Sequence, residues 1–143
     1  MEPLQILLVD DSPGDRALVE EAVRQWTVGF RLRIVEDGEQ ALHYLRKEGG
    51  FSTERRPDLV LLDLDLPRKS GREVLAELKA DESLRTIPVV ILTTSNSEQD
   101  VLTAYGLHAN CYMTKPVDME EYIQKIRAIE EFWFLLARLP HRG

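Results

Sequence analysis

The sequence has almost no cysteine and no hydrophobic run of membrane length. Its single cysteine, Cys111, cannot form an internal disulfide, and its apolar neighbours indicate a buried, inert thiol. The N-terminus carries no basic segment, and its apolar stretch covers only residues 6–9. That stretch is too short for a secretory signal or a membrane span. We therefore expect a cytoplasmic protein with no membrane partner.

Positive charge is also scarce. Eighteen Lys and Arg stand against 25 Asp and Glu, which gives a net charge of -7 at pH 7. This balance disfavours a nucleic-acid partner, because binding a phosphate backbone requires a basic surface. The three histidines, His43, His108 and His141, lie in separate segments, so a histidine metal site is not expected. A length of 143 residues with 43% hydrophobic side chains predicts one domain with a real core.

The sequence does contain short apolar runs that end in polar residues. Continuous runs, as opposed to alternating ones, are typical of central parallel strands covered by helices on both faces. The one alternating segment, residues 30–34, has the pattern of an edge strand. The expected strands cover residues 4–9, 30–34, 59–63, 87–92 and 110–113.

Helices are expected between these strands, because apolar residues recur at helical spacing behind capping residues. The capping residues are Ser12, Asp37, Ser97 and Asp118. The expected helices run from 13 to about 26, from 37 to 49, around 74–78, from 97 to 106, and from 118 onward. Five such alternations predict a parallel sheet with right-handed crossovers. Residues 132–136 are apolar on all sides, so we expect part of this segment to contact a further partner.

Chemically useful side chains follow four of the strands. They are Asp10, Asp11, Asp63, Thr93 and Lys115. Parallel strands bring their carboxyl ends to one edge of the sheet, where ligands bind in open α/β folds. Three carboxylates at close quarters need a cation, and oxygen ligands suit Mg²⁺. The lysine and threonine match the oxygens of a phosphoryl group. The pattern therefore predicts a magnesium site suited to phosphoryl transfer.

Four motifs occur in order, each at a strand end: VDD at 9–11, LLDLDLP at 61–67, LTTS at 92–95 and TKP at 114–116. With these motifs, residues 3–130 resemble the receiver domain of two-component response regulators. The resemblance implies a flavodoxin-like, doubly wound α/β fold: a five-stranded parallel sheet of order 2-1-3-4-5 with five helices, the last one extended. Residues 1–143 are then a single receiver domain, with 130–143 as an apolar extension.

The resemblance also implies roles for the acids. Asp63 would accept a phosphoryl group from a phosphohistidine on a sensor histidine kinase. Asp11, Asp63 and the backbone carbonyl of Asp65 would ligate Mg²⁺, with Asp10 acting through water. Asp65 is acidic where many relatives carry a neutral side chain, and its charge would either slow attack on the donor or tighten cation binding.

Further roles are implied for the remaining polar groups. Lys115 would pair with Asp63 and then with the phosphoryl oxygens, Thr93 would move to bond that group, and Tyr112 would follow as the switch aromatic. The peptide bond between Lys115 and Pro116 would be cis. Seen alone, Thr93 reads as a helix cap, Lys115 as a surface charge and Tyr112 as a core aromatic. The protein would catalyse only its own phosphorylation and dephosphorylation, and is not an enzyme in the usual sense.

The C-terminal FWFLLARLP, the long segment before Pro57 and LHANCYMTKP at 107–116 resemble the single-domain regulators paired with bacterial and cyanobacterial phytochromes. This implies a phytochrome-type kinase as partner and output through protein contacts. We expect a homodimer, with packing within one chain as the alternative. The expected dimer residues are Phe132, Trp133, Phe134, Leu136 and Leu139.

Two other functions compete with this interpretation. The sequence DLDLP at 63–67 also resembles the Asp-x-Asp signature of haloacid-dehalogenase-like phosphohydrolases, in which Asp63 would be the nucleophile and Asp65 the general acid. The motif order counts against it, because in that family the signature ends the first strand. A receiver fold that binds partners without phosphorylation is disfavoured, because every expected acceptor-site residue is present.

Overall fold

The computed structural model describes residues 3–137 and 139–140. Its centre is a five-stranded parallel sheet in the order β2-β1-β3-β4-β5, which confirms the predicted fold and places β2 at an edge. The strands are β1 (Leu4–Val9), β2 (Phe30–Val35), β3 (Leu59–Leu62), β4 (Val89–Thr93) and β5 (Cys111–Thr114).

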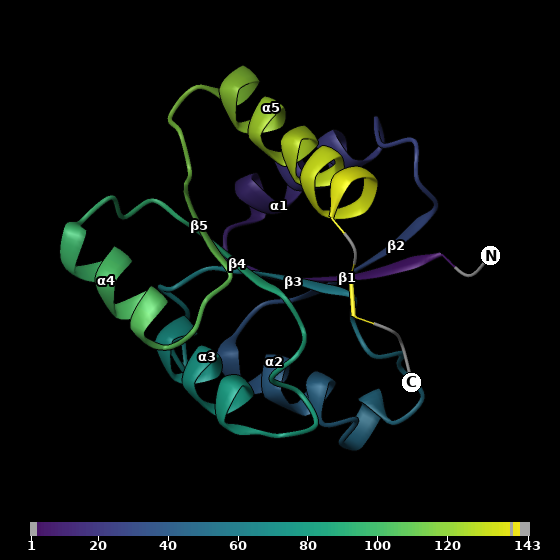
Figure 1. The fold of residues 1–143 in the computed structure, drawn as a ribbon, viewed down its shortest axis with the longest axis vertical. Coiled ribbons are helices and arrows are strands. Elements are labelled where there is room, and N and C mark those ends of the chain that lie inside the picture. Colours follow the sequence, from purple (N-terminus) through teal and green to yellow (C-terminus); the bar gives the residue numbers. More distant parts are fainter. Residues whose placement is uncertain (1–2, 138, 141–143) are drawn as a thin grey trace.

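Helices cover both faces of this sheet (Figure 1). The helices are α1 (Pro13–Val23), α2 (Gly38–Leu45), α3 (Gly71–Ala80), α4 (Glu98–Gly106) and α5 (Met119–Ile129). In Figure 1, α1 and α5 lie on one side of the strands, and α2, α3 and α4 lie on the other. The last helix is extended, as predicted, but the extension Glu130–Leu136 is π-helical. No helix in the described part of the chain is long and apolar enough to cross a membrane.

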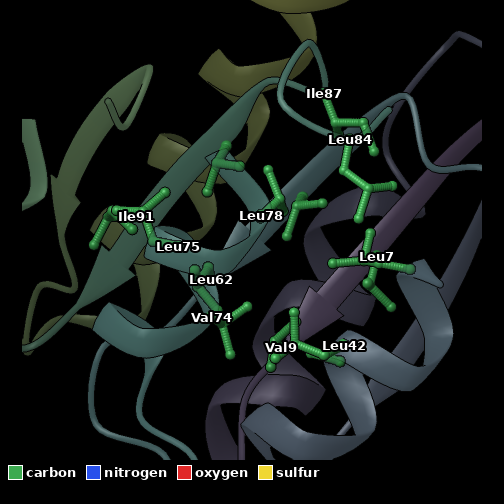
Figure 2. Close-up of a cluster of buried hydrophobic side chains, with 14 of the residues drawn as sticks. Leu7, Val9, Leu42, Leu62, Val74, Leu75, Leu78, Leu84, Ile87 and Ile91 are labelled. Carbon is green, nitrogen blue, oxygen red and sulfur yellow. The ribbon is translucent and has the colours of Figure 1, made fainter. Parts of the chain in front are cut away.

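Aliphatic side chains fill the space between one face of the sheet and helices α2 and α3. Figure 2 shows strand residues Leu7, Val9, Leu62 and Ile91 packed against side chains from the helices and the turn before β4. Those partners are Leu42, Val74, Leu75, Leu78, Leu84 and Ile87, all buried. Burial of this kind stabilises a fold by about 25 cal/mol per Å² of apolar surface removed from water. The face therefore holds the central strands, and so the strand ends, in fixed positions.

The core on the opposite face of the sheet contains more aromatic side chains. Side chains of α1 and α5, including Val19, Tyr122 and Ile126, cover strand residues such as Leu8 and Leu61. The π-helical segment extends this core, because Trp133 and Phe134 are half-buried against it. The Phe134 ring packs edge-on to Trp26 with the ring centroids 5.4 Å apart. Part of the apolar C-terminal segment thus packs on its own chain.

The remainder of that segment faces outward. Phe132 and Leu135 are each 56% exposed, Leu139 is half-buried, and the side chain of Leu136 lies outside the described residues. The expected dimer residues therefore divide between the core and the surface, whereas the sequence pattern treated them as one apolar set.

Four predicted capping residues are confirmed by side-chain hydrogen bonds. Ser12 accepts from the amide of Asp15, Asp37 from Gln40, Ser97 from Asp100, and Asp118 from Glu120 and Glu121. Each bond satisfies a free amide in the first helical turn. Because the turns capped by Ser12, Ser97 and Asp118 begin just after β1, β4 and β5, these caps also fix three of the loops at the carboxyl edge of the sheet.

Several predicted boundaries are wrong. α1 ends at Val23, and Trp26 reaches the core from the following turn. α2 ends at Leu45, well before the expected stop at 49, and Lys47 just beyond it has a left-handed φ of 56°. Helix ends depend on tertiary packing as well as on local signals, so such shifts of a few residues are expected.

Candidate functional site

Backbone pairing beyond the strands positions the site residues. The amide of Asp10 donates to the carbonyl of Val35 at 3.1 Å, that of Asp63 to Val9 at 3.1 Å, and that of Lys115 to Thr93 at 2.6 Å. Each residue thus prolongs the ladder of its strand by one hydrogen bond. The carboxyl edge of the sheet therefore holds these three side chains at fixed backbone positions, on the rim where parallel strands place a ligand.

The Lys115 amine lies at the centre of the site. Its Nζ donates to Asp10 Oδ2 at 2.7 Å, to Asp63 Oδ2 at 2.8 Å and to Asp15 Oδ2 at 2.8 Å. An ammonium group has three N–H donors, so all three are used. Asp10, Asp63 and Lys115 are buried, and charged groups are stable there only when they are paired.

The electrostatics follow from this pairing. Burial acts to lower the pKa of Lys115, but hydrogen bonds to Asp10, Asp15 and Asp63 outweigh it, and the pKa is raised above its usual value. Burial raises the pKa of Asp10, although the hydrogen bond from Lys115 opposes that rise. Lys115 is therefore a permanent positive charge facing the Asp63 carboxylate.

Three carboxylates converge beside the lysine. Ligand oxygens of Asp10, Asp11 and Asp63 all lie within 4.8 Å of one another, with Asp10 and Asp63 buried and Asp11 exposed. Carboxylate oxygens in a half-open arrangement are typical ligands for Mg²⁺, which keeps several waters. The residues present fit a hard divalent cation that enters from the Asp11 side.

The loop after Asp63 packs closely on the acceptor. Asp63 Oδ1 accepts a hydrogen bond from the amide of Asp65 at 3.1 Å. A Cβ added at Gly71, the first residue of α3, would lie 2.0 Å from the Asp63 carbonyl oxygen. Only glycine allows this approach. The Asp65 side chain is 66% exposed, and its Oδ1 lies 3.8 Å from Arg72, so the additional acid lies outside the buried charge cluster.

A second group of contacts lies around β4 and β5. Thr93 is fully buried, and its Oγ1 has no hydrogen-bond partner within the residues described. Tyr112 donates its hydroxyl to the carbonyl of Ser95 at 2.8 Å. Ser95 Oγ donates to Asp100 at 2.6 Å, and Arg72 donates to the same carboxylate at 2.8 Å. Hydrogen bonds from Ser95 and Arg72 lower the pKa of Asp100.

The predicted residues thus meet at one edge, with three differences from the sequence-based expectations. Sequence reasoning missed Asp15, whose only sequence signal is an acid in the first turn of α1. The Lys115–Pro116 bond is trans, as are all peptide bonds between the described residues, so the expected cis bond is wrong. The trans form is favoured by about 0.5–1 kcal/mol even before proline. Cys111 is half-buried where full burial was expected, and that burial still raises its pKa.

Comparisons with known proteins agree with this geometry. Residues 6–127 match the response regulator receiver domain. The response regulator Rcp1 of Synechocystis sp. is 46% identical over 138 residues, which cover 96% of this chain and 94% of Rcp1.

Two solved structures are also similar. The phosphorylated cyanobacterial phytochrome response regulator RcpA matches with a TM-score of 0.95 and 47% identity, over 98% of this chain and 100% of that one. The Mn²⁺-bound form of Rcp1 matches with a TM-score of 0.94 and 45% identity, over 97% of this chain and 100% of that one. Sheet order, the edge site and these matches lead to the same conclusion: the chain belongs to the family of response regulator receiver domains.

Proposed function

We propose that this protein is a phosphorelay response regulator that accepts a phosphoryl group on Asp63 from a sensor histidine kinase. The observation that carries the proposal is the position of the Asp63 carboxylate. It is buried, its Oδ2 lies 2.8 Å from the Lys115 amine, and it lies within 4.8 Å of oxygens of Asp10 and Asp11. A nucleophile, a fixed positive charge and a set of hard oxygen ligands are the parts that phosphoryl transfer requires.

In the proposed reaction, an Asp63 carboxylate oxygen attacks phosphorus and forms the P–O bond. The P–N bond of the donor phosphohistidine breaks, and its electron pair stays on the imidazole nitrogen. Lys115, freed from Asp63, donates to the phosphoryl oxygens and offsets their charge. In the later hydrolysis, a water molecule attacks phosphorus, the bond between phosphorus and the Asp63 oxygen breaks, and inorganic phosphate leaves with Asp63 again a carboxylate.

The proposed cation is Mg²⁺, held by Asp11, Asp63 and the carbonyl of Asp65, with Asp10 acting through water. When bound, it supplies positive charge to the transferring group. The converging carboxylates and the Mn²⁺-bound form of the similar Rcp1 support a divalent ion here.

Signalling is proposed to pass through Thr93 and Tyr112. The buried Thr93 hydroxyl has no hydrogen-bond partner in the part of the chain that the structure describes, and a buried hydroxyl without a hydrogen bond is costly. A phosphoryl oxygen on Asp63 would supply an acceptor, and Tyr112 would move with the loop to which its hydroxyl is bonded. This rearrangement would alter the protein-interaction surface.

The phosphohydrolase alternative is not favoured. A general acid at Asp65 would have to face the leaving group, but this side chain is largely exposed and near Arg72. The family match also covers the pocket from β1 to α5. The steady release of phosphate from small phosphomonoesters would be needed to revive that function.

The kinase partner is proposed to be a phytochrome, because the similar RcpA is described as a cyanobacterial phytochrome response regulator. A homodimer is proposed through the outward part of the C-terminal segment, where Phe132 and Leu135 are exposed. Large exposed apolar side chains on one segment favour association. Sedimentation of only monomer at micromolar concentration, with and without phosphorylation, would exclude this dimer.

Labelled acetyl phosphate with Mg²⁺ tests the acceptor directly. Asp63→Asn should take up no label, whereas the matched variant Asp65→Asn should still be labelled. Label retained on the first variant would overturn the assignment of Asp63.

A further inference from the structure

The third carboxylate on the Lys115 amine belongs to neither the predicted metal ligands nor the acceptor. Asp15 Oδ2 lies 2.8 Å from Lys115 Nζ, although 100 residues separate the two in sequence. We infer that Asp15 is a positioning residue, which holds the Lys115 amine over Asp63 throughout phosphoryl transfer. The inference rests on the proposed function.

The backbone of Asp15 is fixed by the start of α1. Its amide donates to Ser12 Oγ, the cap of α1, at 3.3 Å, and the amide of the next residue, Arg16, donates to the Ser12 carbonyl at 3.0 Å. A carboxylate in the first helical turn is stabilised by the helix dipole. Its side chain is 28% exposed, so it contacts the amine from the rim of the pocket while Asp10 contacts it from the buried side.

The other two partners of the lysine have further duties in the proposed reaction. Asp63 turns from a carboxylate into an acyl phosphate, and Asp10 is one of the three described acids whose oxygens converge as a cation site. Asp15 is not a member of that group. It is therefore the partner that remains available to Lys115 when the other two contacts change.

This role differs from that of a simple negative charge. An additional carboxylate near the pocket repels an anionic donor, so removing its charge alone would leave uptake unchanged or faster. Removing an orienting contact should instead slow uptake, because a misplaced lysine stabilises the oxygens of the transferring phosphoryl group less well. A displacement of 1 Å can reduce a rate by about 100-fold.

The experiment measures label uptake from acetyl phosphate by the full chain over a range of Mg²⁺ concentrations, after circular dichroism has shown that each variant is folded. Asp15→Asn should reduce the maximal rate on the order of 10-fold and leave the Mg²⁺ concentration for half-maximal uptake unchanged. Asp15→Glu, which keeps a carboxylate that can reach the amine, should recover most of the rate. Glu20→Gln removes an exposed charge from the same helix and should behave like the natural protein.

Each other result overturns the inference. An unchanged or faster Asp15→Asn would show that Asp15 does not hold the lysine in place. An equal loss in Glu20→Gln would assign the effect to helix charge, and a shift only in the Mg²⁺ dependence would place Asp15 among the cation ligands. If the rate of uptake is not recovered in Asp15→Glu, the loss in Asp15→Asn comes from altered packing and not from a missing carboxylate. If the natural protein takes up no label, it is the proposed function that fails.

Discussion

Lys115 at the carboxyl edge of the sheet and Arg33 on edge strand β2 are both basic side chains that contact acids far away in sequence. The Lys115 side chain is 3% exposed and donates to three aspartates. The Arg33 side chain is 44% exposed and pairs with Glu54, to which Tyr44 also donates. The same kind of ion pairing thus occurs in the core at Lys115 and at the surface at Arg33.

The difference lies in what each charge loses if its partner is removed. Burying two charges costs desolvation energy, which only their mutual attraction and hydrogen bonds offset. Removing one partner therefore leaves the other charge buried with its desolvation cost uncompensated. An exposed pair is replaced by water and screened by salt. A fold gains little net stability from a buried cluster like that of Lys115, and the role that we propose for this cluster is to present positive charge to the phosphoryl group.

The largest predicted effect is that of Lys115→Met. Without the amine, Asp10, Asp15 and Asp63 remain close together and unpaired, and we expect the free energy of unfolding at pH 7 to fall by about 3 kcal/mol. Urea unfolding with and without Mg²⁺ measures this, and the cation should stabilise the variant more than the natural protein. Lys69→Met, which removes a partly exposed partner of Glu77, should cost less than about 1 kcal/mol. Equal losses in the two variants would remove the distinction between core and surface pairs.

An intermediate effect is expected at Glu130, a buried acid whose hydrogen-bond donors in the structure are neutral groups. Its Oε2 accepts from the amides of Thr27 and Val28 at 2.6 and 2.9 Å, which ties the π-helical segment to the turn before β2. Glu130→Ala leaves both amides without this acceptor and should lower the free energy of unfolding by about 2 kcal/mol. Thermal unfolding measures the loss. Glu131→Ala, at an exposed position, serves as the control, and an equal loss there would contradict the role of Glu130.

Sequence reasoning found the parts of this molecule that local pattern determines. Apolar runs located four of the strands and an alternating pattern located β2. Ser12, Asp37, Ser97 and Asp118 located the starts of four helices, because caps act within one turn. The meeting of Asp63 with Lys115 followed from topology, since parallel strands end at one edge. The roles expected of these residues stay predictions, although the structure brings the side chains together.

What sequence reasoning missed depends on partners distant in the chain. Asp15 reads as an ordinary first-turn acid until Lys115 is placed 100 residues away, and Glu130 meets Thr27 across 103 residues. Residues 132–136 looked uniformly apolar, but in the structure Trp133 and Phe134 pack against the core and Phe132 lies outside it. To predict which of these side chains are buried, one has to know where α5 packs on the sheet.

The smallest predicted effect is the coupling between Arg33 and Glu54, measured by a double-mutant cycle with alanine at each position. An exposed pair contributes about 0.2–1 kcal/mol at pH 7. The hydrogen bond from Arg33 holds the pKa of Glu54 below its usual value of 4.5. The unfolded chain therefore binds the proton more readily than the folded one, so this contribution is present above pH 4.5 and disappears as the pH falls through the lowered pKa.

The coupling free energy between Arg33 and Glu54 should be smaller in 1 M salt, where the screening length falls to about 3 Å. Tyr44 responds at the other end of the pH scale. Burial and then the charge of Glu54 raise its pKa to about 12, so the folded state keeps the phenol proton longer and stability falls as the pH rises above 10. A coupling above about 2 kcal/mol, or one insensitive to salt, would mean that Arg33 and Glu54 form a desolvated pair like the one at Lys115. The contrast between the two clusters would then not follow from exposure.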